Sequence, residues 1–209
     1  MGNVFVFNHP LIKHKIAILR NKDTQTREFK ETMDEITELM VYEVTKDLPL
    51  CEKEILTPLQ KTKVQILADN NITIVPILRA GLGMVEALTK LLPFAVVRHI
   101  GLYRDHDTLK PVTYYNKMPD NMENVDIIIV DPMLALGQSV CETIKILKDK
   151  KVRSIKYMCI MASEDGIKNV SNQHPDVDIF CAEVDKELND SLYIVPGLGD
   201  AGDRLFGTY

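Results

Sequence analysis

The chain has 209 residues, which suits one domain, or one domain with a modest extra arm. Hydrophobic residues make up 45% of it, enough for a sizeable core, and the net charge of −5 with scattered basic residues argues against general nucleic-acid binding. No apolar run approaches the length of a membrane span, and the first ten residues lack the features of a signal peptide. These properties predict a cytoplasmic protein that binds neither nucleic acid nor membrane.

The four cysteines lie far apart without a C-x-x-C pair, and the five histidines show no zinc-ligand spacing. Cys141 and Cys159 fall on elements expected in the core, where a reduced, buried thiol is the usual state. The sequence therefore predicts neither a disulfide framework nor a zinc site.

The first third of the chain predicts helices that cover a core, followed by an irregular arm. A short strand over residues 4–7 precedes a helix over 11–19 and a longer helix over 24–46. Residues 48–65 contain two prolines and predict an extended arm or an edge hairpin. The longer helix carries one apolar face, made of Phe29, Met33, Ile36, Met40 and Val44.

Strands and helices alternate through the rest of the chain, and the strands have the apolar, β-branched sequences that are typical of buried strands. This alternation predicts an α/β fold with a mostly parallel sheet flanked by helices. Residues 105–121 are polar and include two prolines, so we expect a long excursion from the sheet that is a candidate lid loop. The expected strands cover residues 72–78, 95–103, 126–130, 154–161 and 177–184, and the expected helices cover 84–92, 140–147 and 163–172.

Four loops should meet at the carboxyl edge of this sheet, where α/β proteins usually bind their ligands. Arg79 and Arg104 each follow a strand, and a guanidinium there can hold a phosphate through two hydrogen bonds. Asp131 and Asp200 could bind ribose hydroxyls, or a magnesium ion that takes its other ligands from phosphate and water. The loop after Asp131 leads into a helix whose N-terminus attracts a phosphate. Each residue alone would be an ordinary salt-bridge partner, and only their joint position favours a site. The four loops comprise residues 79–83, 104–110, 131–139 and 197–203.

One motif match fails. Gly197, Gly199 and Gly202 fit the G-x-G-x-x-G dinucleotide fingerprint, which must open a helix inside a βαβ unit with an acidic residue about 20 positions later. Only seven residues follow Gly202, so we expect neither the helix nor the acidic residue. The Walker A and G-x-S-x-G patterns are absent from the sequence, which argues against a P-loop ATPase and an α/β-hydrolase.

Four longer motifs stand out: PILRAGLGM at 76–84, YRD at 103–105, IVDPMLA with Gly137 and Ser139 at 129–139, and YIVPGLGDAGDRLFGT at 193–208. They closely resemble the signatures of uracil phosphoribosyltransferase, a type I phosphoribosyltransferase, and the likeness runs essentially from end to end. The resemblance implies a single domain over residues 1–209, with an N-terminal helical segment, a β-arm at 48–65 and a C-terminal, uracil-binding hood at 185–209.

The resemblance implies transfer of a phosphoribosyl group from 5-phosphoribosyl 1-pyrophosphate (PRPP) to uracil, which gives UMP and pyrophosphate in pyrimidine salvage, with Mg²⁺ accompanying PRPP. By resemblance the catalytic residues are Arg79, Arg104, Asp131 and Asp200, which also bind PRPP. Asp200 would act on the metal only indirectly, through PRPP and water. The PRPP loop continues through Pro132, Met133, Leu134, Ala135, Leu136, Gly137, Gln138 and Ser139, and the uracil-binding residues are Ile194, Gly199, Asp200 and Ala201.

The resemblance also extends to partners and regulation. It implies a homo-oligomer, a dimer or a larger assembly, with the N-terminal helices and the arm at 48–65 as the candidate interface. Some members of the family respond to GTP, which leaves a GTP-binding, allosteric enzyme as one alternative.

The phosphate loop departs from the family's usual A-T-G-G-S pattern, because it reads Ala135-Leu136-Gly137-Gln138-Ser139. Leu136 stands where a threonine hydroxyl would contact the phosphate, a contact worth about 1.5–3 kcal/mol. Gln138 replaces a glycine, and we expect the backbone there to lose access to a positive φ. Two hypotheses follow: an active enzyme that binds PRPP weakly, or a catalytically impaired member that serves as a ligand-binding or regulatory protein. The retained arginines and aspartates at the sheet edge favour the active enzyme, and the tail argues against a different base.

Overall fold

A computed structural model describes the backbone of residues 2–104 and 111–208, and all side chains in these ranges except that of Arg104. Within these ranges nine strands form one sheet in the order β1-β11-β10-β8-β4-β6-β7, with β5 beside β4 and β9 beside β10. All described pairs in this sheet are parallel except β6 with β7 at one edge. The predicted α/β fold with a mostly parallel sheet is confirmed. The strands are β1 (Val4–Val6), β4 (Ile72–Leu78), β5 (Val96–Val97), β6 (Ile100–Arg104), β7 (Pro111–Asn116), β8 (Asp126–Val130), β9 (Met133–Leu134), β10 (Ser154–Ser163) and β11 (Asp178–Asp185).

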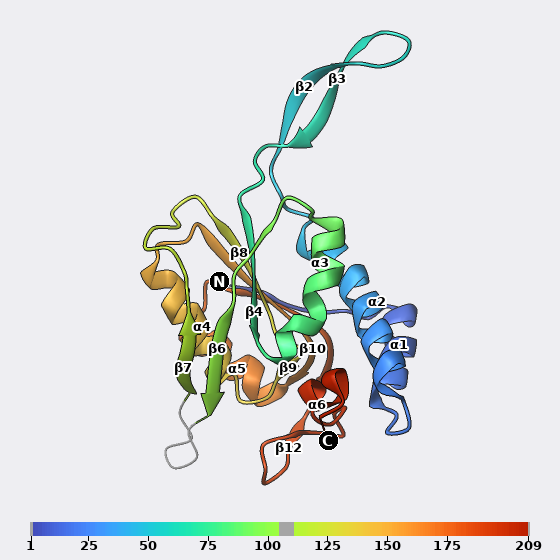
Figure 1. Ribbon diagram of the computed structural model, residues 1–209, viewed down its shortest axis with the longest axis vertical. Helices are drawn as coiled ribbons and strands as arrows, with labels where there is room; N and C mark the ends of the chain where they lie inside the picture. The colour runs from blue at the N-terminus through green and yellow to red at the C-terminus, as the bar shows by residue number, and fades with distance from the viewer. Residues whose placement is uncertain (1, 105–110, 209) are drawn as a thin grey trace.

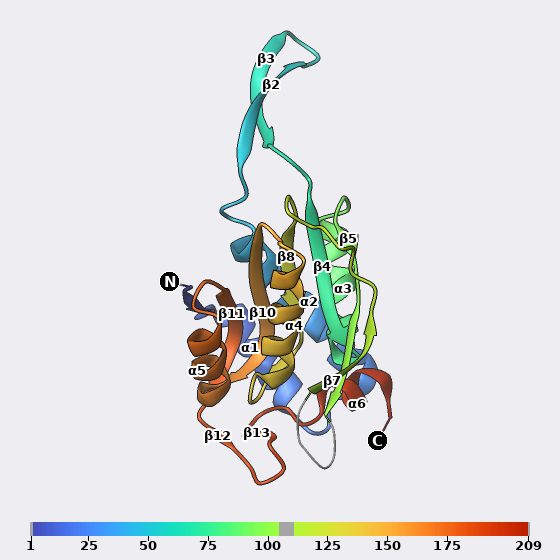
Figure 2. The same ribbon diagram turned by 90° about the vertical axis from the view of Figure 1, so that its left-hand side faces the viewer.

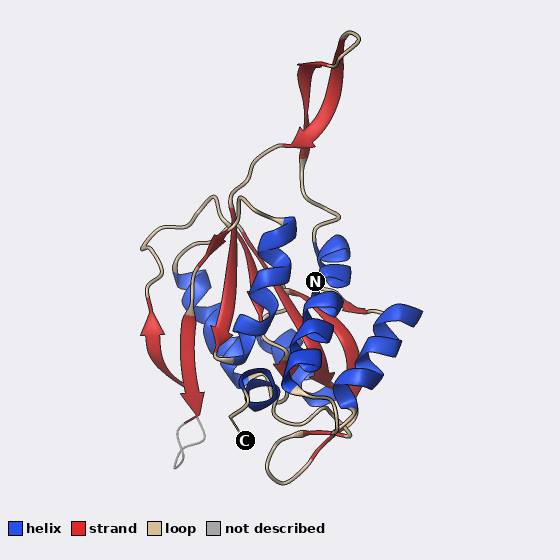
Figure 3. Cartoon of the chain, turned by 45° about the vertical axis from the view of Figure 1, so that its right-hand side comes forward, coloured by secondary structure: helices blue, strands red, loops and turns tan. Residues whose placement is uncertain are grey.

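Helices cover both faces of the sheet (Figures 1 and 3). One apolar cluster joins the sheet to the layer of α1, α2, α3 and α6, and a second cluster joins it to α4 and α5. The five residues of the predicted apolar face of α2 are all at most 1% exposed, so that face is confirmed as core. The helices are α1 (Pro10–Arg20), α2 (Thr26–Val44), the 3₁₀ turn η1 (Ala80–Met84), α3 (Val85–Leu91), α4 (Gln138–Asp149), α5 (Glu164–Gln173) and α6 (Ala201–Phe206).

The central strands β4 and β8 have the predicted boundaries, because each is a continuous apolar run that is buried between the two helical layers. They pair in parallel with Ile72 opposite Asp126 and Pro76 opposite Val130. The chain therefore leaves both strands at the same edge of the sheet, and the segments that begin at Arg79 and Asp131 start next to each other.

The region expected as an arm is a hairpin of β2 (Leu50–Leu56) and β3 (Lys61–Leu67), which pair only with each other. Figures 1 and 2 show it projecting well beyond the body of the molecule. All of β2 is exposed, so nothing within the described chain covers either of its faces. Exposed apolar side chains on the hairpin are Leu50, Ile55, Leu56, Leu59 and Ile66.

Two predictions on the other side of the sheet need correction. The strand expected over 95–103 is divided into β5 and β6, which pair with separate parts of β4. The excursion expected over 105–121 is wrong for Pro111–Asn116, which returns as the antiparallel edge strand β7. A proline at the first residue of an edge strand removes no hydrogen bond that the sheet needs. Residues 105–110 of the candidate lid lie outside the described residues.

The tail also contains more regular structure than its sequence predicts. Glu187–Leu188 (β12) and Ile194–Val195 (β13) form a small antiparallel ribbon, and α6 begins at Ala201. The helix α6 begins within the glycine pattern, but among the described residues no strand follows it, so the pattern forms no dinucleotide-binding βαβ unit there.

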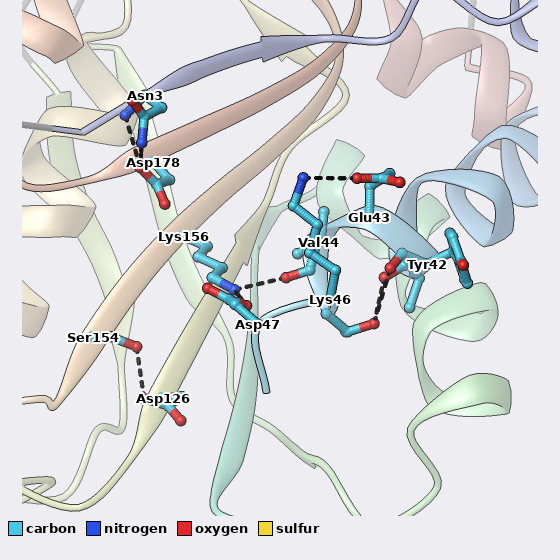
Figure 4. Close-up of polar contacts among 12 residues, drawn as sticks. Asn3, Tyr42, Glu43, Val44, Lys46, Asp47, Asp126, Ser154, Lys156 and Asp178 are labelled. Atoms are coloured by element: carbon cyan, nitrogen blue, oxygen red, sulfur yellow. Dashed lines mark hydrogen bonds and ion pairs between the residues drawn. The ribbon is translucent and has the colours of Figure 1, made fainter. Parts of the chain in front are cut away.

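The amino edge of the sheet is closed by polar contacts, several of which are drawn in Figure 4. The backbone N–H of Asn3 donates to Asp178 Oδ1 at 2.7 Å, and Ser154 Oγ donates to Asp126 Oδ1 at 2.6 Å. Lys156 Nζ donates to the carbonyl of Val44 at 2.7 Å, which ties the end of α2 to β10. Among the described residues no helix is both long and apolar enough to cross a membrane.

Candidate functional site

A cavity of about 220 Å³ opens at the carboxyl edge of the sheet, where three segments far apart in the sequence meet. The first is η1 after β4, the second is the loop after β8, and the third is the tail, which we call the hood (residues 185–208). The position agrees with the rule that ligands of open α/β sheets bind beyond the carboxyl ends of the strands. The lining residues are Ala80, Asp131, Met133, Ala135, Leu192, Tyr193, Ile194, Gly199, Asp200, Ala201 and Gly202.

The loop after β8 is held from the side of α5. Ser163 Oγ donates to the carbonyl of Ala135 at 2.6 Å, and Asn169 Nδ2 donates to the carbonyl of Leu136 at 2.7 Å. These bonds fix two consecutive carbonyls in front of α4. Because no side chain caps the N-terminus of α4, the first N–H groups of that helix stay available to an anion.

The expected strain at Gln138 is wrong. The positive φ of this loop, 74°, belongs to Gly137, while Gln138 is the first residue of α4 and is not among the described residues with a positive φ. A side chain at position 137 would also collide with Val170, since a Cβ there would lie 2.8 Å from Val170 Cγ2. Gln138 lines a separate cavity of about 290 Å³ together with Lys145 and His174. The glutamine is therefore compatible with the loop's backbone.

Asp131 places its carboxyl group inside the cavity. Burial raises the pKa of this carboxyl to about 7, and a long hydrogen bond from the Met133 N–H, at 3.4 Å, offsets only part of that effect. The buried Tyr157 lies behind it, with Oη 3.5 Å from the Asp131 carbonyl oxygen. Asp131 therefore changes its charge near neutral pH, which is a property of groups that act on ligands.

Asp200 stands on the opposite side of the cavity, as the N-cap of α6. Its Oδ1 accepts a hydrogen bond from the Asp203 N–H at 2.9 Å, and its Oδ2 lies 3.5 Å from Tyr193 Oη. The charge of Asp200, followed by partial burial, raises the pKa of Tyr193. Tyr193 was missed by sequence reasoning, although it directly precedes the predicted Ile194 and belongs to the same motif.

The two predicted arginines are less completely placed. Arg79 follows β4 directly, its side chain is 59% exposed, and its Nη2 lies 3.4 Å from Asp203 Oδ1. It stands outside the cavity lining, which its neighbour Ala80 joins. Arg104 ends β6, but its side chain lies outside the described residues. The structure thus brings Asp131 and Asp200 together and leaves Arg79 beside the cavity.

Some of the predicted site residues line the cavity, and others lie beneath or beside the loop that lines it. Pro132 and Leu134 are buried below the loop, and the segment from Leu136 to Ser139 leads from the cavity to α4. Among the side chains that the structure describes, no three histidine, cysteine, aspartate or glutamate residues converge on a metal position. The site therefore has no all-protein metal cage within the described chain. The predicted residues in the lining are Asp131, Met133, Ala135, Ile194, Gly199, Asp200 and Ala201.

A cavity of about 590 Å³ also lies at the amino edge, between α2 and the starts of β8, β10 and β11. Most of its acidic side chains form ion pairs with basic ones, as Asp126 does with Arg153 and Asp176 does with Lys148. None of the predicted site residues lines it. Another cavity, of about 610 Å³, borders the hood and includes Gly199 and Asp200 in its lining. Size alone therefore does not select the cavity in which most of the predicted residues lie.

Comparisons with known proteins show the family of the chain. Residues 6–208 match the profile of a family described as "Uracil phosphoribosyltransferase". The chain is 56% identical to the uracil phosphoribosyltransferase of Geobacillus kaustophilus and 55% identical to that of Bacillus caldolyticus, each over 208 residues and the whole of both chains. A solved protein from Aquifex aeolicus shares 36% identity and a TM-score of 0.92, with 98% of each chain covered.

More distant solved structures share the fold alone. The adenine phosphoribosyltransferase of Trypanosoma brucei superposes with a TM-score of 0.57 at 10% identity, over 92% of this chain and 88% of that one. Full-length matches at more than half identity, together with the family profile, are far stronger than this likeness of fold. The chain belongs to the uracil phosphoribosyltransferase family.

Proposed function

We propose that the protein transfers the phosphoribosyl group of PRPP to uracil and releases pyrophosphate, with UMP as the product of a pyrimidine salvage reaction. The observation that carries this proposal is the carboxyl-edge cavity, which combines the loop of Asp131 with the hood in a chain of this family. The cavity is small and has few charged groups, which suits a small uncharged base next to a ribose.

The loop from Asp131 to Ser139 would hold the ribose and its 5-phosphate. Its backbone is fixed by Ser163 and Asn169, and it ends at the uncapped N-terminus of α4, which favours an anion. The carboxylate of Asp131 can accept hydrogen bonds from ribose hydroxyls. Arg79 and Arg104 would hold the pyrophosphate, because a guanidinium matches the geometry of phosphate oxygens.

The chemistry requires positioning more than a reactive side chain. As pyrophosphate leaves C1 of the ribose, positive charge develops on the sugar and negative charge on the leaving group. Arg79 and Arg104 would stabilise the negative charge, and the carboxylates of Asp131 and Asp200 would face the sugar. These roles require no covalent nucleophile.

Uracil would be recognised by backbone groups of the hood. Ile194 and the segment from Gly199 to Ala201 line the cavity, and Gly199 has a positive φ of 80°, which other residues rarely adopt. A carbonyl that accepts from N3–H and an N–H that donates to O4 select uracil. Cytosine reverses both groups, so buried polar atoms would remain unpaired.

Mg²⁺ is part of the proposal as a companion of PRPP. The acidic donors at the cavity, Asp131 and Asp200, are hard oxygen ligands of the kind that Mg²⁺ prefers, and too few converge to replace its waters. Asp200 would therefore act on the ion through PRPP and water. When bound, the ion would neutralise charge on the pyrophosphate.

The variant phosphate loop is compatible with activity in this proposal. Gln138 takes a backbone conformation that it tolerates, so the remaining loss is the hydroxyl that Leu136 lacks. Losing one hydrogen bond to a charged group weakens binding roughly tenfold to a hundredfold. We therefore expect an active enzyme with a high KM for PRPP, in place of the catalytically impaired alternative.

The test is UMP formation from uracil, PRPP and Mg²⁺ over a wide PRPP range, with cytosine as the alternative base. The double variant Leu136→Thr/Gln138→Gly should lower the KM for PRPP at a similar kcat. Turnover that persists unchanged in Arg79→Ala would point to a contaminating host enzyme. If the native protein and the double variant were both inactive, the proposal would be wrong. Added GTP in the same assay tests the activation that some family members show.

We also propose that the protein is a homo-oligomer, a dimer at least, in which a second copy covers the hairpin arm. An isolated two-stranded hairpin is marginally stable in water, and Leu56 and Leu59 at its tip are 75% and 94% exposed. Sedimentation should give at least a dimer mass for the native chain and a smaller species for Leu56→Glu/Leu59→Glu. Leu91→Glu, which adds an acidic charge at an exposed leucine of α3, serves as the control. A monomeric native chain would contradict the proposal.

We place this activity in the cytoplasm, a proposal supported by the exposed free thiol of Cys51, which suits a reducing compartment. The predicted buried thiols of Cys141 and Cys159 are found as free cysteines in the core. Activity recovered only in a membrane or secreted fraction would contradict this location.

A further inference from the structure

Behind the hood, the half-buried ion pair of Arg20 and Asp185 binds both the N–H and the carbonyl of Gly197. The N–H of Gly197 donates to Asp185 Oδ2 at 2.9 Å, and its carbonyl accepts from Arg20 Nη1 at 3.0 Å. Arg20 also donates from Nη1 and Nη2 to the two carboxylate oxygens of Asp185, each at 2.7 Å. The end of α1, the end of β11 and the hood are joined in this closed network, which we call the Gly197 clamp.

The clamp grips the hood at its tightest turn. Gly197 has a positive φ of 55°, and a Cβ at this position would lie 2.0 Å from the carbonyl oxygen of Ile194. Only glycine fits this close approach, so the position of Gly197 and the direction of the Ile194 carbonyl depend on each other. Because Ile194 and Gly199 lie three residues before and two residues after it, the clamp stands between the two parts of the hood that line the cavity.

A second arginine reinforces the same turn from the opposite direction. Arg204, in α6, is 8% exposed and donates from Nη1 to the carbonyl of Leu198 at 2.8 Å and to that of Leu19. Its Nη2 donates to the carbonyl of Asn21 at 2.7 Å. The consecutive carbonyls of Gly197 and Leu198 are thus each bound by an arginine, and both arginines connect the hood to the end of α1.

The charges of the clamp are stable at neutral pH. Burial would raise the pKa of Asp185, but the hydrogen bonds from Arg20 and from the Gly197 N–H outweigh burial and lower it. The hydrogen bond with Asp185 in turn raises the pKa of Arg20. An ion pair that stays charged and is bidentate holds its geometry well, because the planar guanidinium fixes direction as well as distance.

We propose that Arg20 and Asp185 are positioning residues for base recognition, which set the backbone of the hood through Gly197. Neither side chain lines the carboxyl-edge cavity, in which uracil would bind. They would therefore act on uracil only through the spacing between Ile194 and Gly199. The proposal rests on the proposed function, since it concerns how the same site reads its base. A clamp that were merely structural would affect stability and both substrates alike.

The experiment uses two variants. Asp185→Asn keeps the size of the side chain, and Arg20→Lys keeps the positive charge but loses the planar guanidinium that forms two parallel hydrogen bonds. In Asp185→Asn an amide NH₂ would face N–H donors of Arg20 or Gly197. We expect KM for uracil to rise roughly tenfold or more, the loss of one charge-assisted hydrogen bond, while KM for PRPP stays within about twofold. The preference for uracil over cytosine should fall in both variants.

The matched control is Arg153→Lys at the amino edge. Arg153 also forms a bidentate contact with an aspartate, with Nη1 and Nη2 at 2.8 Å and 3.1 Å from the Asp69 carboxylate, and it lies outside the base cavity. We expect this variant to lose thermal stability without a change in either KM. If Arg153→Lys raised KM for uracil as much as Arg20→Lys does, or if the clamp variants raised both KM values equally, the proposal would be overturned.

A binding measurement separates the clamp from the proposed function. UMP and ribose 5-phosphate share the sugar and phosphate, and only UMP carries the base. In calorimetry the clamp variants should lose affinity for UMP, roughly tenfold, and keep their affinity for ribose 5-phosphate. A native protein that binds both equally and forms no UMP would refute the proposed function. A native protein that prefers UMP, with variants that keep the full preference, would refute the clamp alone.

Discussion

The two edges of the sheet differ in how their carboxylates are paired. At the amino edge, hydrogen bonds from Arg153 lower the pKa of Asp69. Burial would raise the pKa of Asp126 there, but the hydrogen bonds from Arg153 and Ser154 outweigh it and the pKa is lowered. At the carboxyl edge, no described basic side chain pairs with Asp131, and burial raises its pKa to about 7.

This contrast separates the two edges independently of cavity size. The amino-edge cavity is larger than the carboxyl-edge one, about 590 Å³ against about 220 Å³, but most of its acidic side chains are already paired with basic ones. The carboxyl edge keeps a carboxyl group that no described basic side chain pairs with, and a helix N-terminus without a side-chain cap. Groups left unsatisfied by the protein are those that a ligand can satisfy, which is why such groups gather at active sites.

The largest expected effect tests the contrast directly. Asp131→Asn should lower kcat/KM for PRPP by about a hundredfold or more, because it removes charge next to the reacting sugar. Asp126→Asn at the amino edge should leave kcat/KM within about twofold and lower the free energy of unfolding, since it breaks bonds to Arg153 and Ser154. Steady-state kinetics and urea denaturation measure the two effects. Equal losses of activity in both variants would remove the distinction between the edges.

A smaller effect is expected at the rim of the cavity. Arg79→Ala should lower kcat/KM for PRPP roughly tenfold to a hundredfold, the size expected for one charge-assisted contact with pyrophosphate. The affinity for ribose 5-phosphate, which lacks the pyrophosphate, should not change. Arg27→Ala is the control, because Arg27 is also exposed and paired with a carboxylate, Glu31, but lies on α2. A loss of ribose 5-phosphate binding in Arg79→Ala would contradict this role.

Particular elements show what the sequence could predict. The strands β4 and β8 were predicted residue for residue, because a continuous β-branched run between loops has few alternatives inside an α/β fold. The edge strand β7 was missed because its residues are mostly exposed, and the helix α6 because it has only six residues and begins among glycines. Both elements exist through tertiary contacts that local patterns do not encode.

The site was predictable to a similar degree. Asp131 and Asp200 came from motif and edge position, and the structure places both in the cavity lining. The Gly197 clamp could not have been predicted, because Arg20 and Asp185 are 165 residues apart and neither belongs to a motif. The error at Gln138 has the same origin, since only the structure shows that Gly137 carries the positive φ.

The pH dependence of PRPP use sharpens the contrast further. The folded-state pKa of Asp131 is raised, so the carboxylate that accepts ribose hydroxyls forms only as the pH rises through about 7. We expect kcat/KM for PRPP to increase up to this pH and then to level off, changing up to tenfold per pH unit below it. In Asp131→Asn this inflection should disappear, which separates it from the ionisation of the phosphates. An unchanged inflection in the variant would assign it to another group.

The smallest expected effect concerns a carboxyl group away from both edges. Asp34 on α2 has a buried Oδ1 without a hydrogen-bond partner among the described residues, and burial, aided by the charge of Glu86, raises its pKa to about 6. A raised pKa on an acid means that ionisation costs stability, increasingly from about pH 4 to pH 6 and constantly above. Asp34→Asn should therefore stabilise the fold by about 1 kcal/mol at pH 8, after allowance for solvent near this half-buried group, and by nothing at pH 4.

Urea denaturation at the two pH values measures this difference, with the exposed Asp190→Asn as the control. Burial raises the pKa of Asp34 as it raises that of Asp131, but Asp34 lines none of the cavities described here. Its replacement should leave kcat/KM unchanged. If Asp34→Asn instead reduced activity as much as Asp131→Asn does, a carboxyl group with a raised pKa would affect function even where it lines no cavity. The difference between the two edges would then lie in the charge of their carboxyl groups alone, because a raised pKa would affect activity even without a cavity for a ligand.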